Sequence, residues 1–356
     1  MKLLPAAMVP GDRDRKKAVK VLSLLRRAAE VSGWARGGGS DRYLPAKEIC
    51  RSLSLDPEAL YKAIASLRGL GYEIEEDAGR GFRLLSSPDI PYPWELAAGL
   101  STRWLGRTAM FFPEVTSTNE IVLQLAREGA PAGLVVVAER QTAGRGRRGR
   151  EWLSPAQQGL WFSLLLRPAL PPEKIPPLAL HTAGAVALTI RELYQLNAEV
   201  KWPNDVMIGG RKVCGILMEM RADAGGGRHL VIGIGVNVNM APGELPPEIE
   251  ATATSLRLEL KQPVCRLPLL QNLLVNLERC YDQFADESKH ADLMDLARRL
   301  SCTLGREVVV RGTDLAPAGF AGQAVAIEAD GSLKVEAASG EVRWFHAGDV
   351  SVRPER

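Results

Sequence analysis

The chain has 356 residues, a length that exceeds one ordinary domain, so we expect two or three. Hydrophobic residues make up 46% and charged residues 24%, which is typical of a globular protein. The formal net charge of +3 excludes nucleic-acid binding through overall charge, so any such contact needs a local basic patch.

The first part of the chain predicts three helices followed by a hairpin. Residues 13–32 repeat apolar side chains at helical spacing, with a basic opposite face. "LPAKEICRSL" predicts a short helix, and Asp56 is expected to cap the next one, with Pro57 at its first position and Gly71 after its end. "YEIEEDAGRGFRLL" predicts two strands around a glycine turn. This arrangement is typical of a DNA-binding winged helix-turn-helix.

A composition change near residue 87 predicts the first domain boundary. The stretch "SSPDIPYPW" is rich in proline and serine, which favours a linker. We therefore expect a winged helix-turn-helix domain over residues 1–87.

The middle of the chain alternates helices and strands. Ser117 and Glu120 predict a capping box at the start of a helix. "GLVVVAE", "GLWFSLLL" and "HLVIGIGVNVNM" predict buried strands, and a long apolar helix is expected over residues 175–196. "AEVKWPNDVMIGGRKVCGILMEM" predicts strands joined by a Gly-Gly hairpin turn. Residues 88–300 are therefore expected to form an α+β domain with a mixed or antiparallel sheet, ending in helices over 266–300.

The last part of the chain predicts a small β domain. "GREVVVRG", "FAGQAVAIEADGSLKVEAA" and "EVRWFHAGDVSV" predict short strands separated by turns. We expect residues 301–356 to form a β-barrel of the SH3 type.

The loop "QTAGRGRRGREW", residues 141–152, follows a predicted buried strand. Its glycines allow backbone amides to approach a ligand, and its arginines supply fixed positive charge and forked donors for phosphate or carboxylate. By composition alone it is an anion clamp, a solvated basic loop, or a contact for single-stranded nucleic acid.

Three further motifs carry weaker signals. "KWPND" combines a lysine, an amide and a carboxylate, yet it is equally consistent with a polar turn around a packed tryptophan. Lys212 precedes an apolar strand, where it either reaches solvent or points at a charged ligand. In "GIGVNVN", Asn237 and Asn239 are expected on one face of a strand, beside glycines that allow a flat ligand to lie on the sheet.

Several chemistries have no support in the sequence. There is no P-loop and no GxSxG motif, the four histidines have no metal-ligand spacing, and five scattered cysteines include no CxxC pair. We therefore expect no protein-held metal and no disulfide framework. The apolar runs are too short for a signal peptide or a membrane span, so a cytoplasmic protein without a membrane partner is expected.

Taken in order, "STN", "QTAGRGRRGREW", "KWPND", "GRKVCGILME" and "GIGVNVN" closely resemble the motifs of the biotin–protein ligases. The N-terminal part makes the chain similar to the bifunctional members, which also repress biotin genes. The resemblance implies that biotin and MgATP form biotinyl-5′-adenylate, and that biotin then passes to a lysine of biotin carboxyl carrier protein. It further implies binding of operator DNA and a homodimer when the adenylate is bound.

The resemblance also implies roles for individual residues. Lys212, Arg145, Arg147 and Asp205 would be catalytic, and Asn204 would join Asp205 where the acceptor lysine meets the intermediate. ATP or adenylate would contact Trp152, Asn237, Arg148 and Arg150. Biotin would contact Ser117, Thr118, Asn119, Gln141, Arg145, Gly146, Arg147, Lys212, Gly215 and Gly233.

The DNA-binding part departs from the family pattern. DNA contacts are expected from Lys62, Arg68, Arg80 and Arg83. However, the recognition helix begins with the acidic residues Asp56 and Glu58, whereas phosphate contact requires positive charge. "GWARGGGSDRY" also resembles an insertion relative to a compact winged helix.

Two alternatives to the bifunctional ligase stay open. One is a lipoyl ligase with the same acyl-adenylate chemistry, although "GRGRRGREW" paired with "KWPND" favours biotin. The other is a DNA-binding regulator that senses biotin without catalysis, which the complete set of lysine and arginines disfavours.

Overall fold

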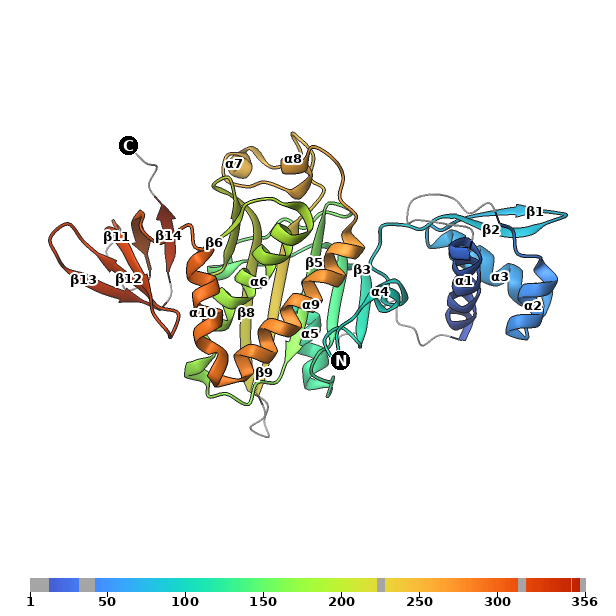
Figure 1. Cartoon of the computed structure of the whole chain (residues 1–356), viewed down its shortest axis with the longest axis horizontal. Coiled ribbons are helices and arrows are strands. Elements are labelled where there is room, and N and C mark those ends of the chain that lie inside the picture. Colours follow the sequence, from blue (N-terminus) through green and yellow to red (C-terminus); the bar gives the residue numbers. More distant parts are fainter. Residues whose placement is uncertain (1–12, 32–41, 223–227, 313–317, 347, 353–356) are drawn as a thin grey trace. The chain divides into compact units, whose positions relative to one another are not determined.

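The structure is a computed structural model that describes residues 13–31, 42–222, 228–312, 318–346 and 348–352 (Figure 1). The chain forms two compact units, and the division between them falls between Trp94 and Glu95. The first unit holds helices and a hairpin, and the second holds two sheets with their helices.

The first unit has the predicted order of elements. They are α1 (Arg13–Val31), α2 (Ala46–Leu53), α3 (Pro57–Gly69), β1 (Glu73–Asp77) and β2 (Gly81–Ser86). The predicted cap is confirmed, because Asp56 Oδ1 accepts a hydrogen bond from the Ala59 amide at 2.7 Å. Leu22, Leu60 and Phe82 are buried and join the apolar faces of α1, α3 and the hairpin into a core. Residues 33–41 of the predicted glycine-rich loop lie outside the described residues.

The proline-rich segment after β2 packs its aromatic rings into the first unit. Trp94 Nε1 donates to the Tyr72 hydroxyl at 2.8 Å, and the Tyr92 ring stacks on Trp94 with 4.8 Å between centroids. The Tyr92 hydroxyl donates to the Leu70 carbonyl at 3.1 Å. These buried rings make the segment part of a core, although its proline and serine content is typical of a linker.

The second unit is built on a seven-stranded sheet. β3 and β4 are parallel and the other neighbours are antiparallel, so the predicted mixed sheet is confirmed. Gly209 and Gly210 have φ values of 56° and 76° and form the predicted hairpin turn. In the order β3-β4-β5-β9-β8-β7-β6, the strands are β3 (Ala109–Val115), β4 (Val135–Gln141), β5 (Gly159–Leu166), β9 (Arg228–Asn237), β8 (Arg211–Ala222), β7 (Asp205–Ile208) and β6 (Ala198–Lys201).

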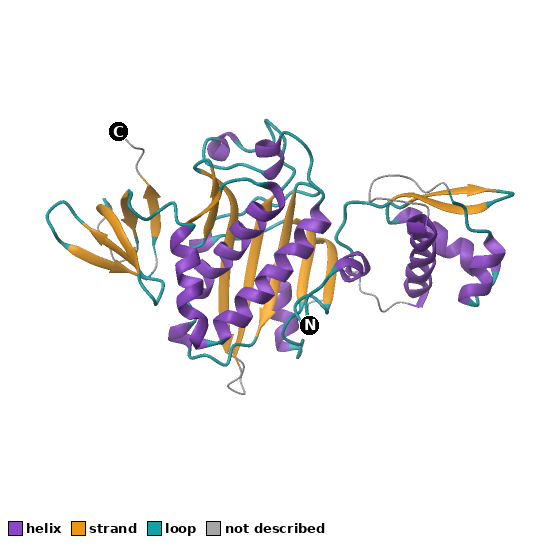
Figure 2. Ribbon diagram, viewed as in Figure 1, coloured by secondary structure: helices purple, strands orange, loops and turns teal. Residues whose placement is uncertain are grey.

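Helices cover both faces of this sheet (Figure 2). Side chains alternate along a strand, so Val231 packs with the helix α5 (Thr118–Arg127), whereas Ile232 packs with α6 (Pro177–Tyr194) and α9 (Arg266–Ala285). The remaining helices of this unit are α4 (Pro93–Gly99), which spans the division between the units, α7 (Pro247–Glu250), α8 (Leu256–Leu260) and α10 (His290–Arg299).

The predicted capping box at the start of α5 is wrong. Ser117 stands at the N-cap position, but its side chain makes no capping hydrogen bond. Glu120 Oε2 accepts instead from the Thr116 hydroxyl at 2.7 Å. The Ser117 side chain is thereby left for the cavity described below.

A five-stranded antiparallel sheet follows α10 in the same unit. Its order is β13-β12-β11-β10-β14. Trp202 connects it to the central sheet, because its amide donates to Thr303 Oγ1 at 3.0 Å and its Nε1 donates to the Gly331 carbonyl at 2.9 Å. The strands are β10 (Glu307–Arg311), β11 (Phe320–Ile327), β12 (Leu333–Glu336), β13 (Val342–Phe345) and β14 (Asp349–Val352).

The carboxylate of Glu278 on α9 holds the loop before β3. It accepts hydrogen bonds from the backbone amides of Arg103, Trp104 and Leu105 at 2.8–3.0 Å, and the residue is 7% exposed. Burial by itself favours the protonated acid, but the three amides hold the pKa of Glu278 below its ordinary value.

We expect Glu278→Gln to lower the free energy of unfolding at pH 7 by about 1–2 kcal/mol, since it replaces charge-assisted bonds with neutral ones. A lowered folded-state pKa stabilises the protein above the unfolded pKa of about 4.3, and this contribution is lost as pH falls through the folded-state pKa. Urea unfolding between pH 7 and pH 3 should therefore show a smaller difference between variant and wild type at low pH. The exposed Glu248→Gln is the control, and equal losses in both variants would contradict the role of Glu278.

Candidate active site

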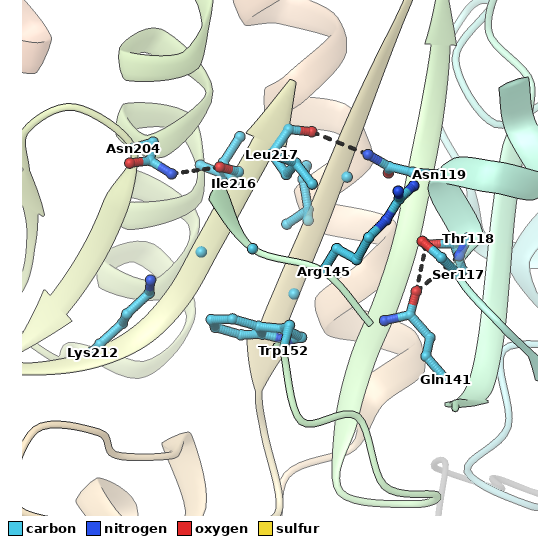
Figure 3. A pocket seen from close by; sticks show the side chains of 15 residues that line it. Ser117, Thr118, Asn119, Gln141, Arg145, Trp152, Asn204, Lys212, Ile216 and Leu217 are labelled. Carbon is cyan, nitrogen blue, oxygen red and sulfur yellow. Dashed lines mark hydrogen bonds between the residues drawn. The ribbon is translucent and has the colours of Figure 1, made fainter. Parts of the chain in front are cut away.

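A cavity of about 50 Å³ lies on the α5 face of the central sheet, along β8 and β9 and beside the end of β4 (Figure 3). It brings together most of the predicted biotin-binding residues, from Ser117 near the start of α5 to Gly233 on β9. Its lining residues are Ser117, Thr118, Asn119, Gln141, Arg145, Gly146, Trp152, Asn204, Lys212, Gly215, Ile216, Leu217, Gly233, Ile234 and Gly235.

One end of the cavity is a network of hydrogen bonds around Gln141. Its Oε1 accepts from the Thr118 amide at 2.8 Å and from the Thr118 hydroxyl at 3.1 Å. Its Nε2 donates to Ser154 Oγ at 2.8 Å, which fixes the orientation of the amide. This end therefore presents ordered donors and acceptors suited to a compact polar ring.

The floor of the cavity is made of glycines on β8 and β9. A Cβ atom on Gly233 would lie 2.2 Å from Asn119 Oδ1, and one on Gly235 would lie 2.3 Å from Trp152 Nε1. A Cβ on Gly215 would lie 2.8 Å from Trp152 Cζ3. The absence of side chains at these three positions lets Asn119 and the indole lie directly on the sheet.

The other end of the cavity carries positive charge. Lys212 Nζ lies 2.7 Å from Asp205 Oδ1 and 5.1 Å from the centre of the Trp152 ring. Figure 3 shows this lysine pointing along the sheet beside the indole. Trp152 Nε1 is buried and has no hydrogen-bond partner among the described residues. The lysine and the indole together suit an anionic group next to a planar one.

The arginines of the loop after β4 point to different places. Arg145 Nη2 lies 3.3 Å from Glu120 and 3.8 Å from Glu219 at the edge of the cavity. Arg148 and Arg150 form ion pairs with Asp349 of β14, where Arg148 Nη1 lies 3.3 Å from the carboxylate. The loop is thus tied both to the cavity and to the C-terminal sheet.

Arg147 lies outside the cavity and contacts it through Asn204. Its Nη1 donates to Asn204 Oδ1 at 2.9 Å, and Asn204 Nδ2 donates to the Ile216 carbonyl at 2.6 Å. Burial lowers the pKa of Arg147. Arg147 lines a second cavity of about 280 Å³, which shares Asn204 and Ile216 with the first.

Asn237, a predicted contact of ATP or adenylate, is not among the residues that line either cavity. Its Nδ2 donates to the Thr254 carbonyl at 3.0 Å. Asn239 follows the end of β9 and bonds to the Val264 backbone through both side-chain atoms, at 2.8 and 2.9 Å. In this structure both asparagines hold the chain segments that follow β9.

Glu219 and Asp349 contact the loop after β4, and neither contact was predicted from the sequence. The strand period offers a signal for Glu219, because it shares a strand face with Gly215 and Leu217 on β8. Asp349 offers no such signal, since it lies 199 residues from Arg150 in the chain.

No group of three or more histidine, cysteine, aspartate or glutamate side chains arranged for a metal ion occurs among the described residues. In the same part of the chain, the helices are all too short or too polar to cross a bilayer.

Comparison with known proteins identifies the family. Residues 111–237 match the biotin/lipoate A/B protein ligase family, and residues 303–353 match the biotin protein ligase C terminal domain. The chain is 34% identical over 312 residues to the bifunctional ligase/repressor BirA of Bacillus subtilis, covering 88% of this chain and 94% of that protein. It is 33% identical over 230 residues to the Escherichia coli protein of the same name, covering 64% of this chain and 65% of that protein.

A solved structure agrees with this assignment. The biotin protein ligase from Aquifex aeolicus in complex with biotin and ATP superposes with a TM-score of 0.59 at 30% identity, covering 70% of this chain and 100% of that one. The predicted resemblance is therefore confirmed. The chain belongs to the biotin protein ligases, in the group of bifunctional ligase/repressors.

Proposed function

We propose that the chain activates biotin with MgATP to biotinyl-5′-adenylate, releasing pyrophosphate, and transfers biotin to a lysine of biotin carboxyl carrier protein, releasing AMP. The observation that carries this proposal is the cavity itself. It joins the Gln141 network, the glycine floor and Lys212 in the order in which a ureido ring, an apolar chain and a carboxylate follow one another in biotin.

The charges around the cavity suit the first step. When the biotin carboxylate attacks the α-phosphate of ATP, two anions approach each other, so cations must stabilise the transition state. Lys212 lies at the cavity and Arg145 at its edge, with further positive charge from Arg147, Arg148 and Arg150 in the same loop. We assign adenylate contacts to Trp152, Arg148, Arg150 and Asn237. Mg²⁺ would enter with ATP and offset phosphate charge.

The second step places the acceptor lysine near Asn204 and Asp205. The second cavity adjoins the first at Asn204 and opens between apolar side chains that include Ile175 and Met218. A carrier lysine in the second cavity would reach the adenylate in the first cavity beside Asn204. We assign to Asp205, 2.7 Å from Lys212, the role of accepting a proton from the incoming amine or of orienting it.

The free cavity must enlarge when substrates bind. Its volume of about 50 Å³ is far below ~300 Å³, the lower end of the usual range for pockets that bind small molecules. Movement of the arginine loop and of Trp152, which rests on the glycine floor, would supply the space.

The direct test is to incubate the protein with biotin, MgATP and a biotin carrier domain, and to measure the carrier mass. We expect one added biotin on the carrier. Pyrophosphate–ATP exchange with biotin and with lipoate separates this function from a lipoyl ligase. Exchange with lipoate but not with biotin, or a carrier of unchanged mass, would overturn the proposal. If the carrier mass is unchanged and no exchange occurs either, the result would favour a regulator without catalysis.

We expect Gly233→Ala to raise the KM for biotin about tenfold, since the added Cβ must displace Asn119 and such overpacking costs about 1–3 kcal/mol. Gly184→Ala on α6 is the matched control, because a Cβ there meets nothing within 4 Å. An unchanged KM for Gly233→Ala would contradict the role of the glycine floor.

The first unit is proposed to be a winged helix-turn-helix that binds operator DNA of biotin genes. Its order of three helices and a hairpin supports this, as does the likeness to proteins named ligase/repressors. Each assigned DNA-binding cation has an acidic neighbour. Lys62 pairs with Glu58, Arg68 with Glu76, Arg80 with Asp77 and Arg83 with Glu75. DNA phosphates must therefore compete with these carboxylates for the same cations. Binding through phosphate contacts is expected to weaken as salt rises.

Gel shifts with the promoter DNA of the organism's own biotin genes test the repressor role. We expect a complex at low salt when the adenylate is present, and none with a chain that begins at Glu95. Ligation by that shorter chain would support two separable units. No shift by the full chain would remove the repressor role and leave the ligase standing.

We also propose a homodimer in the adenylate-bound state, and an SH3-like barrel for the C-terminal sheet. The domains are proposed as residues 1–87, 88–300 and 301–356 of a cytoplasmic protein, with the aromatic segment that ends at Trp94 packed on the first of them. The dimer is supported by an edge of β8. Among the described residues, no strand pairs with residues 218–222 of β8 on the side opposite β9. A strand from a partner can pair with such an edge. Sedimentation with and without the adenylate tests the dimer, and a monomer in both conditions would contradict it.

A further inference from the structure

Glu219 is a largely buried carboxylate beside the cavity that the reaction steps above do not use. It lies on β8 opposite Val231 of β9, on the strand face that also carries Gly215 and Leu217. Its side chain is 16% exposed. A carboxylate in such a position is stabilised by its hydrogen bonds and charged neighbours.

The first partner of Glu219 is Asn119, which lines the cavity. Asn119 Nδ2 donates to Glu219 Oε2 at 2.8 Å, and Asn119 Oδ1 accepts from Ser163 Oγ at 2.6 Å. An ionised carboxylate only accepts hydrogen bonds, so it selects the amide orientation in which nitrogen faces Glu219. Gly233 leaves room for this amide to lie on the sheet.

The second set of partners consists of two arginines. Glu219 Oε2 lies 3.8 Å from Arg145 Nη2, and Oε1 lies 3.5 Å from Arg221 Nη2. Arg145 has another carboxylate, Glu120, at 3.3 Å, whereas the other acceptor of Asn119 Nδ2 among the described residues is the Leu217 carbonyl at 3.5 Å. The contact with Asn119 is also the shorter of the two, so loss of Glu219 should affect Asn119 most.

We propose that Glu219 is a positioning residue for biotin, which fixes the amide of Asn119 against the glycine floor so that the ligand meets a defined pattern of donor and acceptor. This proposal rests on the proposed function, because it assigns a role in the same cavity. Glu219 itself does not line the cavity and acts through Asn119.

Glu219→Ala removes the closer of the two acceptors of Asn119 Nδ2 and leaves the Leu217 carbonyl at 3.5 Å, so the amide is held less firmly. We expect the KM for biotin in pyrophosphate exchange to rise about tenfold while kcat changes less than about twofold. The reason is that one charge-assisted hydrogen bond is lost, and this bond orders the binding site before the reaction begins. Glu219→Gln keeps the size and one acceptor oxygen, so it should restore most of the lost affinity. A purely structural role would lower Tm without this split between KM and kcat.

A double-mutant cycle tests the route through Asn119. If Glu219 acts through that amide, the double variant Asn119→Ala/Glu219→Ala should have the KM of Asn119→Ala alone. If the double variant instead raises the KM for biotin by the product of the two single effects, the proposal is overturned.

Two further variants exclude the arginines as the route. Glu120→Gln weakens the other carboxylate contact of Arg145 without touching Asn119, and Arg221→Gln removes an exposed partner of Glu219. Both should keep the wild-type KM for biotin. A rise with Glu120→Gln equal to that with Glu219→Ala would assign the effect to Arg145 and overturn the proposal. Wild-type protein without biotin-dependent exchange would instead refute the proposed function, so the two failures are distinguishable.

Discussion

Replacing Lys212 with alanine is expected to lower the rate of biotinyl-adenylate formation by about 10²–10³-fold while the fold survives. The amine lies at the cavity, 31% exposed, and is held 2.7 Å from Asp205. It is thus a fixed positive charge at the end of the cavity where the carboxylate and the α-phosphate are expected to meet. Removing it leaves the developing negative charge without its nearest cation.

Biotin-dependent pyrophosphate–ATP exchange measures this step apart from transfer to the carrier. Lys62→Ala, in the first compact unit, is the control and should keep the wild-type exchange rate. The circular dichroism spectrum should be unchanged in both variants. Exchange at the wild-type rate in Lys212→Ala would remove the catalytic assignment of this lysine.

Arg147→Gly is expected to release the adenylate about 10- to 100-fold faster than wild type. The Arg147 guanidinium donates to Asn204, which borders the cavity, and so holds the arginine loop against the turn between β6 and β7. A hydrogen bond from a charged donor contributes about 1.5–3 kcal/mol, which sets the size of the effect if the contact is lost when the loop opens. Adenylate formation should continue, because Lys212 and Arg145 remain.

Escape of an activated acid has a visible consequence. Free biotinyl-adenylate acylates exposed lysines, so Arg147→Gly should label a bystander such as albumin when supplied with biotin and MgATP. Filter binding times the release. Arg148→Gly is the informative comparison, because Arg148 has φ 58°, which glycine tolerates, and it pairs with Asp349 instead. Slow release from Arg147→Gly together with fast release from Arg148→Gly would place retention at the C-terminal sheet.

Local signals in the sequence were sufficient for most of the elements. The Asp56 cap depends on an amide three residues away, and the Gly209–Gly210 turn depends on two adjacent φ values. Interactions of this range are encoded in neighbouring residues, so they can be predicted without the fold. The motifs that line the cavity were also found from the sequence, because each is a short run with its own composition.

Prediction from the sequence failed where two nearby groups competed for the same side chain, and where a composition typical of linkers also occurs in a packed segment. Glu120 bonds to Thr116 and not to the Ser117 amide, since the hydroxyl of Thr116 is within reach of the same carboxylate. The segment that ends at Trp94 has the composition of a linker, but its rings find a buried site on Tyr72. In the first case the competing partners, Thr116 and Ser117, both lie in the same short segment. In the second case the outcome depends on Tyr72, which the segment itself does not contain.

The sequence by itself determined the family, the mixed sheet with its helices, and the residue types needed for an acyl-adenylate. The tertiary structure alone decided which partner each charge finds. Arg147 meets Asn204, Arg150 meets Asp349, and Glu219 meets Asn119. The reason is physical: a charged side chain is stabilised by whichever opposite charge or dipole the folded backbone brings within a few ångströms. Those pairings are separated by 57 to 199 residues along the chain, a distance over which no local pattern specifies a contact.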